Sequence, residues 1–229
     1  MRTKHLPSQK QPKRIFIVDD HPVFREGLTS LIRREADLSV CGEADDAPRA
    51  LTALEKANPD LMLVDIGLPG RSGLELIKDL RAACPGVAVL VISMYHEALY
   101  AERVLRAGAR GYVMKQEGPG KILQAIRQVL EGQIYLSGNI AGRLLHTFSS
   151  GRQTRAASAI ERLSDRELEV LQLVGQGHDS HAIARQLHVS FRTVDTHRGN
   201  LKKKLELRNR TELTRYAARW VTEQAAARG

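Results

Sequence analysis

The chain has 229 residues, of which 42% are hydrophobic and 27% charged, a length that suits two domains. No apolar run approaches the roughly 18 residues that a membrane span needs, so we expect no membrane partner. The net charge of +9 is uneven, because residues 1–151 carry 20 basic and 17 acidic side chains and residues 152–229 carry 15 and 9. This asymmetry indicates a C-terminal part that faces nucleic acid, although by charge alone a solvated basic surface would explain it equally well.

The N-terminal segment is basic and polar, with the sequence MRTKHLPSQKQPKR. The apolar run that follows, IFIV, is too short for the core of a signal peptide. We therefore predict a disordered leader over residues 1–13. Cys41 and Cys84 have neither CxxC nor metal-ligand spacing, which is typical of buried thiols in a reducing compartment. We expect a cytoplasmic protein.

Short apolar runs then alternate with amphipathic segments over the first 130 residues. Mostly continuous runs rich in Val, Ile and Leu are typical of strands that are buried on both faces of a parallel sheet. They lie at 14–18, 38–44, 60–64, 87–93 and 109–114. Helical spacing occupies the intervals 22–35, 47–57, 73–83, 97–107 and 118–131. Five such repeats predict an α/β domain with a doubly wound, five-stranded parallel sheet over residues 14–132.

The pattern changes after residue 132. Residues 133–162 are rich in Gly, Ser, Thr, Gln and Arg, with SSGRQTRAAS at 149–158, and predict a linker. From 163 to 229 we predict a small all-α domain, whose helices divide at Gly177, at 188–190 and near 207–209. Its last helix, 211–224, has an apolar stripe that suits either a dimer surface or packing onto its own domain.

The functional groups of a doubly wound sheet gather at the carboxyl ends of its strands. Asp19 and Asp20 follow the first strand, Asp65 the third, Ser93 ends the fourth, and the fifth runs into Lys115. Carboxylates this close are tolerable only around a cation, and oxygen ligands of this kind favour Mg²⁺. A carboxylate can also attack phosphorus, while Mg²⁺ and Lys115 neutralise charge on the phosphoryl oxygens.

Each of these residues has an ordinary structural explanation when taken singly. An Asp-Asp pair after a strand is often a helix cap, and Asp65 before Gly67 and Pro69 suits a turn. A Ser or Lys at a strand end is usually only exposed. The functional interpretation depends on five such residues at matching strand ends.

The segments VDDHPVFREGL, LVDIGLPGRSGLEL, VISMYHE and GARGYVMKQE closely resemble receiver domains of two-component response regulators. The resemblance implies that Asp65 is the phosphoacceptor, and that Asp19, Asp20, Asp65 and the backbone carbonyl of Gly67 hold Mg²⁺. It further implies that Ser93 and Lys115 contact the phosphoryl group. Tyr112 would be the aromatic switch residue, although a half-buried strand aromatic explains it without the family.

A helix-turn-helix is predicted in the C-terminal domain. Ser164 and Glu167 form a capping box, Ala184 precedes a tight turn, and Ser190 caps a helix whose inner face carries Val194 and Leu201. The side chains that we predict to contact DNA are Arg192, Thr193, Asp195, Thr196, His197, Arg198, Asn200, Lys202 and Lys203. On physical grounds alone, a basic three-helix surface also suits an acidic protein partner.

The stretch 163–213 is similar to the LuxR-type DNA-binding domain of the NarL/FixJ subfamily of response regulators. Its matching positions include Leu163, Glu167, Gly177 and Val194. Two departures concern contacts with DNA: HDSH at 178–181 replaces the usual opening of the second helix, and Asp195 stands where a basic residue is frequent.

Together the two resemblances imply a response regulator transcription factor. A sensor histidine kinase would phosphorylate Asp65, and the phosphorylated protein would form homodimers that bind paired DNA half-sites. In many relatives the unphosphorylated receiver covers the recognition helix. Two other classes stay open: a phosphatase or phosphotransferase with the same chemistry, and a constitutive DNA-binding or adaptor protein. The intact set of Asp19, Asp20, Asp65, Ser93 and Lys115 argues against the adaptor. The lack of a separate general base argues against an enzyme, leaving slow autodephosphorylation at most.

Overall fold

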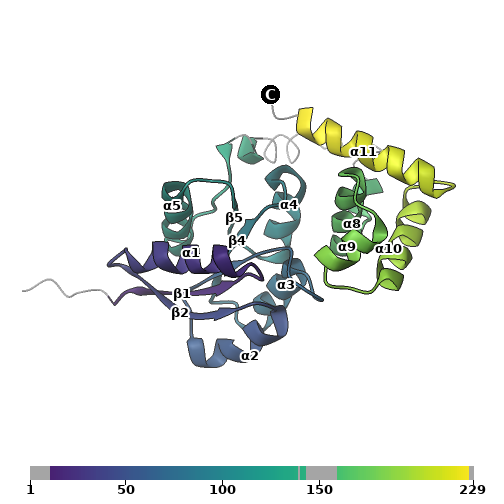
Figure 1. Cartoon of the computed structure of the whole chain (residues 1–229). Coiled ribbons are helices and arrows are strands. Elements are labelled where there is room, and N and C mark those ends of the chain that lie inside the picture. Colours follow the sequence, from purple (N-terminus) through teal and green to yellow (C-terminus); the bar gives the residue numbers. More distant parts are fainter. Residues whose placement is uncertain (1–10, 139, 143–158, 227–229) are drawn as a thin grey trace, which may run out of the picture.

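The structure is a computed structural model that describes residues 11–138, 140–142 and 159–226 (Figure 1). Most of the predicted leader and much of the predicted linker lie outside the described residues. The described part comprises an α/β domain and a helical domain. None of its helices combines the length and the apolar character of a membrane span.

The N-terminal domain is built on five parallel strands in the order β2-β1-β3-β4-β5. They are β1 (Lys13–Val18), β2 (Leu38–Ala44), β3 (Leu61–Val64), β4 (Ala88–Ser93) and β5 (Gly111–Met114). Each strand is followed by a helix: α1 (Pro22–Arg33), α2 (Ala47–Ala57), α3 (Gly73–Ala83), α4 (Glu97–Ala107) and α5 (Pro119–Leu130). The predicted doubly wound sheet is confirmed, and the strand order reverses between β1 and β3, where such folds place their sites.

Side chains on each strand alternate between two separate cores. On β1, Ile15 and Ile17 pack with the buried residues of α1 and α5, whereas Phe16 and Val18 pack on the other face of the sheet with α2, α3 and α4. Both faces of the central strands are buried, so β3 and the second half of β1 are continuously apolar, whereas the edge strand β2 carries Ser39 and Glu43. The core on the α2–α4 face continues into the helical domain.

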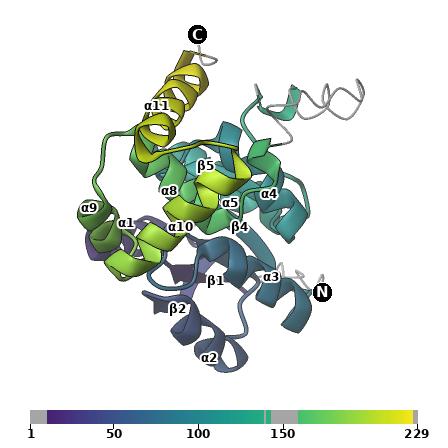
Figure 2. The same ribbon diagram turned by 90° about the vertical axis from the view of Figure 1, so that its right-hand side faces the viewer.

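The C-terminal domain consists of α8 (Asp165–Gly175), α9 (Ser180–Gln186), α10 (Phe191–Lys204) and α11 (Arg210–Ala226). The predicted capping box at the start of α8 is present, and Ser190 caps α10 by accepting a hydrogen bond from the backbone N–H of Thr193 at 3.0 Å. α8 lies on the side of α3 and α4, and α10 lies on the side of the helical domain away from the receiver sheet (Figures 1 and 2).

The apolar stripe of α11 packs onto its own domain. Leu213 and Ala217 are fully buried, and Trp220 is 7% exposed. At Gly175 of α8 a Cβ atom would lie 2.5 Å from the carbonyl oxygen of Ala217, so the absence of a side chain lets the two helices approach. Of the two roles left open for this stripe, the structure supports intradomain packing.

The start of the predicted linker packs on the α/β domain. The N–H of Tyr112 donates to the carbonyl of Tyr135 at 3.0 Å, and the N–H of Ser137 donates to Glu97 at 2.7 Å. The chain therefore stays attached to β5 and α4 beyond residue 132. The free thiols of Cys41 and Cys84 are only half-buried, so the prediction that both are buried was wrong.

Candidate functional site

The three predicted carboxylates meet at one edge of the sheet. Asp19 and Asp20 follow β1, and Asp65 follows β3, whose neighbouring position is fixed by the pairing of Val18 with Val64. Asp19 is fully buried and Asp65 is 3% exposed. Burial, and then repulsion from Asp65, raises the pKa of Asp19. The charged form of Asp19 is thus disfavoured unless a cation lies nearby.

Lys115, one residue beyond β5, supplies one such cation. Its Nζ lies 2.7 Å from Oδ2 of Asp19 and 2.6 Å from Oδ2 of Asp65, and its side chain is 3% exposed. Burial alone would lower the pKa of Lys115, but attraction to Asp65 and Asp19 outweighs burial and raises it. The ammonium group is therefore held charged beside the Asp65 carboxylate.

The donor set fits a divalent cation. One oxygen each of Asp19 and Asp20 is buried and accepts no hydrogen bond, although Lys115 and His21 lie within ion-pairing distance of them. Ligand atoms of Asp19, Asp20, His21 and Asp65 lie within 4.8 Å of one another. Buried carboxylate oxygens without hydrogen bonds are what an oxygen-ligated ion such as Mg²⁺ requires.

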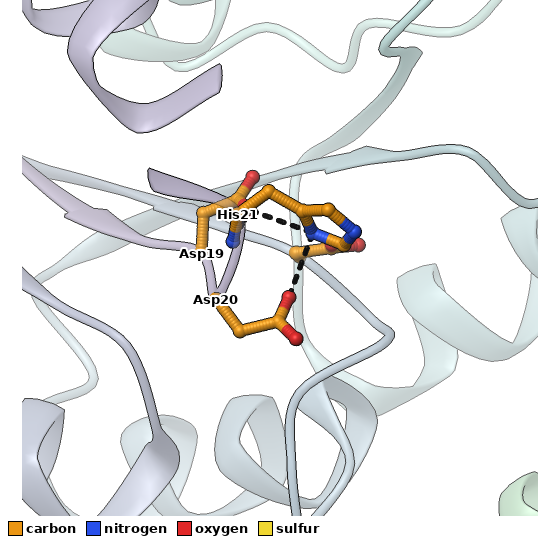
Figure 3. A group of neighbouring side chains, drawn as sticks. Asp19, Asp20 and His21 are labelled. Carbon is orange, nitrogen blue, oxygen red and sulfur yellow. Dashed lines mark hydrogen bonds and ion pairs between the residues drawn. The ribbon is translucent and has the colours of Figure 1, made fainter. Parts of the chain in front are cut away.

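His21 belongs to this group and was not predicted. Its Nδ1 lies 2.8 Å from Oδ1 of Asp20 and 3.3 Å from Oδ1 of Asp19, and Figure 3 shows the ring close to both residues, above the Asp20 carboxylate. The available signal was its position directly after the Asp-Asp pair.

Ser93 and Tyr112 are linked through the backbone of Tyr95. Ser93, at the end of β4, is 1% exposed, and its Oγ accepts a hydrogen bond from the N–H of Tyr95 at 3.3 Å. The hydroxyl of the fully buried Tyr112 donates to the carbonyl of Tyr95 at 2.6 Å. Burial raises the pKa of Tyr112, so the phenol stays a donor at neutral pH. The half-buried position considered for Tyr112 was wrong: its ring is fully inside.

The backbone around Asp65 is tightly packed. The N–H of Gly67 donates to Oδ1 of Asp65 at 3.2 Å, and the N–H of Gly73 donates to the carbonyl of Ile66 at 2.9 Å. A Cβ atom at Gly73 would lie 1.9 Å from the carbonyl oxygen of Asp65. Glycine at position 73 therefore allows α3 to begin directly against the loop that carries the carboxylate.

The predicted DNA-contact side chains differ in exposure along α10. Arg192, Asp195, Thr196 and Lys203 are exposed, whereas Thr193, His197, Asn200 and Lys202 are intermediate. The receiver thus leaves the outward face of α10 uncovered, unlike the arrangement that the resemblance implied for many relatives.

The prediction that Arg198 lies on the outward face was wrong. Arg198 is 5% exposed, and its guanidinium donates to Oγ of Ser180 at 2.5 Å. It shares the inner face with Val194 and Leu201, at the helical spacing of four and three residues. Burial lowers the pKa of Arg198. The side chain joins α10 to the start of α9.

The two domains are joined by polar contacts at the start of α8. Arg103 of α4 donates to the carbonyls of Leu163 at 2.8 Å and Ile160 at 2.7 Å, and to Asp165 at 3.1 Å. Lys78 of α3 donates to the same Asp165 at 2.9 Å. No feature of the sequence predicted these contacts.

Comparisons with known proteins match both halves of the chain. The family model for the response regulator receiver domain matches residues 15–127, and that for bacterial regulatory proteins of the luxR family matches residues 161–217. The nitrate/nitrite response regulator protein NarL of Escherichia coli (strain K12) is 32% identical, over 95% of this chain and 98% of its own length. The oxygen regulatory protein NreC of Staphylococcus epidermidis is 32% identical, over 89% of this chain and 96% of its own.

Solved structures of response regulators are also similar to this chain. RcsB of Salmonella enterica serovar Typhimurium, bound to promoter rprA in the presence of the phosphomimetic BeF3-, has a TM-score of 0.60 and 26% identity, covering 91% of this chain and 99% of that chain. A LuxR-family two-component response regulator from Aurantimonas sp. SI85-9A1 has a TM-score of 0.57 and 34% identity, covering 61% of this chain and 99% of that chain.

Proposed function

Because the chain belongs to the NarL/FixJ subfamily of two-component response regulators, we propose that Asp65 accepts a phosphoryl group and thereby controls DNA binding by α10. The observation that carries the phosphoacceptor role is the buried arrangement of Asp65, Asp19 and Lys115 at the strand ends. The donor is a sensor histidine kinase, and the protein acts in the cytoplasm.

In the phosphotransfer step a carboxylate oxygen of Asp65 forms a bond to phosphorus. The phosphorus–nitrogen bond of the phosphohistidine breaks, and the imidazole nitrogen leaves with the electron pair. Mg²⁺ held by Asp19, Asp20, Asp65 and the carbonyl of Gly67 would supply charge neutralisation for the phosphoryl oxygens. Lys115 already touches Oδ2 of Asp65, so it binds an oxygen of the transferred group without a large movement.

Ser93 and Tyr112 carry the change to the rest of the receiver. Both hydrogen-bond to Tyr95, so a phosphoryl group that engages the Ser93 hydroxyl alters the position of the β4–α4 loop. A local electrostatic change then biases a two-state element. The phosphorylated protein forms homodimers, and a dimer of α10 helices binds two DNA half-sites.

This chemistry does not make the protein an enzyme for external substrates. The acyl phosphate on Asp65 is lost by slow attack of water, which is autodephosphorylation. The regulatory output is the DNA-bound state.

Intact mass after incubation with Mg²⁺ and acetyl phosphate tests the phosphoacceptor role. We expect one added phosphoryl group on the wild type and none on Asp65→Asn, because an amide is a much poorer nucleophile than a carboxylate. Asp37→Asn is the matched control and should behave as the wild type, because Asp37 directly precedes β2 and so lies at the amino ends of the strands, away from the site. Equal phosphorylation of Asp65→Asn would refute the assignment.

The salt dependence of DNA binding tests the surface of α10. Each phosphate contact adds about 0.9 to the slope of log Kobs against log salt concentration, so Lys203→Ala should reduce this slope by about one on a random-sequence duplex. Arg198→Ala should leave the slope unchanged and lower the free energy of unfolding by about 1 to 3 kcal/mol, because it leaves a buried hydrogen-bonding partner unsatisfied. The reverse pattern would place Arg198, not Lys203, at the DNA.

A further inference from the structure

Residues of the helical domain line one side of the proposed phosphorylation site. A cavity of about 240 Å³ lies over Asp65. Its receiver side includes Asp20, Asp65 and Ser93, and its far side is formed by Gln186 and His188. These last two residues flank Leu187 at the end of α9, in the turn between the helices of the helix-turn-helix.

The position of His188 is fixed by the turn that carries it. Its backbone is left-handed, with φ of 51°, and its N–H donates to the carbonyl of Arg185 at 3.2 Å. The imidazole Nε2 lies 3.7 Å from Oδ2 of Asp20. A side chain of the DNA-binding domain thus approaches a carboxylate that we assign to the metal site.

Arg166 holds this turn against the receiver. Its guanidinium donates to the carbonyl of Gly70, in the loop after Asp65, at 2.9 Å, and to the carbonyl of Leu187 at 3.2 Å. It also pairs with the buried carboxylate of Glu169. One side chain therefore bridges the loop of the phosphoacceptor and the residue before His188, while Arg103 fixes the start of α8.

We propose that residues 186–188 limit the access of phosphodonors to Asp65 and thereby help to determine which donors phosphorylate it. This inference rests on the proposed phosphoacceptor role of Asp65. Reacting atoms must come within about 3 to 3.5 Å for transfer, and a protein-borne phosphohistidine cannot reach Asp65 while this turn covers it. A small phosphodonor enters the cavity but is hindered by Gln186 and His188. The kinase therefore phosphorylates only molecules in which the two domains have separated, and its apparent rate scales with their fraction.

Phosphorylation rates of full-length variants test the proposal, with Mg²⁺ and acetyl phosphate as the probe. In the transfer, the Asp65 carboxylate forms the new bond to phosphorus while the bond from phosphorus to the acetate oxygen breaks. The double variant Gln186→Ala, His188→Gly shortens both side chains, and glycine accepts the left-handed backbone. We expect its rate to rise by at least about fivefold, the lower end of ordinary coupling between sites. Arg103→Ala should raise the rate as well, by releasing α8.

Glu206→Gly is the matched control, since Glu206 is also exposed and left-handed, with φ of 58°, and does not line the cavity. Its rate should equal that of the wild type. Rates of the double variant and Arg103→Ala that equal the wild-type rate would overturn the proposal.

Carbodiimide labelling of Asp20, read by peptide mass spectrometry, tests the covering contact without phosphotransfer. The Asp20 side chain is 14% exposed beneath the two histidines, so labelling should increase in the double variant and in Arg103→Ala, but not in Glu206→Gly. Unchanged labelling would refute the cover. If labelling rises while no variant accepts phosphate, the phosphoacceptor role fails and the covering contact stands.

Discussion

Gly73→Ala is expected to abolish phosphorylation of Asp65 and to lower the free energy of unfolding of the receiver by about 3 kcal/mol, at the upper end for overpacking. The added Cβ would lie 1.9 Å from the carbonyl oxygen of Asp65 and 2.9 Å from Cα of Ile66. Both are backbone atoms, so relief requires the loop that carries the phosphoacceptor to move. Urea denaturation and intact mass after acetyl phosphate treatment measure the two effects.

Gly27→Ala is the matched control, because Gly27 lies in α1 with no atom within 4 Å of the added Cβ. Alanine should stabilise this helix by up to about 1 kcal/mol and leave phosphorylation intact. A Gly73→Ala protein with wild-type denaturation midpoint and wild-type phosphorylation would show that the close approach to Asp65 has no consequence.

Glu169→Gln is expected to remove a pH-dependent loss of stability. Burial raises the pKa of Glu169 from 4.5 to about 7, even though Arg166 opposes the shift. The folded protein therefore binds a proton that the unfolded chain has released between these pH values, and stability falls as pH rises from about 4.5 to about 7, then levels off. At 1.36 kcal/mol per pKa unit, the loss is about 3 kcal/mol.

The measurement is the free energy of unfolding of the wild type minus that of the variant, at pH 5 and at pH 8. Subtraction cancels the other titrating groups that the two proteins share. Glu223→Gln, whose side chain on α11 is 65% exposed, should show no such difference between the two pH values. If Glu169→Gln keeps the wild-type pH profile, Glu169 does not carry the effect.

The sheet and its site were predictable because each depends on a local pattern. Mostly apolar runs marked the five strands, and Asp19, Asp65 and Lys115 followed three of them. Parallel strands put these ends at one edge. The exact burial of Lys115 between the two acids was not predictable from spacing, because side-chain packing decides it.

The charge of Arg198 led to a wrong prediction of the face of α10 on which it lies, whereas helical periodicity indicated the correct face. Val194, Arg198 and Leu201 recur at four and three residues and share one face of α10. The basic side chain favoured the outward face, and the short side chain of Ser180 on α9, which the guanidinium contacts, belongs to a different helix. Its tertiary partner decided the orientation.

The contacts between the domains could not be predicted from the sequence, for another reason. Arg103 meets residues about 60 positions away, and Arg166 meets Gly70 across 96 positions. No periodicity connects such distant segments. An isolated arginine on a helix is predicted to be solvent-exposed as long as the surface that it contacts is unknown.

The division of the receiver into two cores has a consequence for communication with the helical domain. Among the described residues, only the core on the α2–α4 side is shared with that domain, and the sheet separates it from the core beneath α1 and α5. Separation of the domains would thus expose the α2–α4 side of the receiver to solvent. The core beneath α1 and α5 would keep the same neighbours. A spectroscopic reporter on α4 should register domain separation, whereas the same reporter on α5 should give the unchanged baseline against which that signal is read.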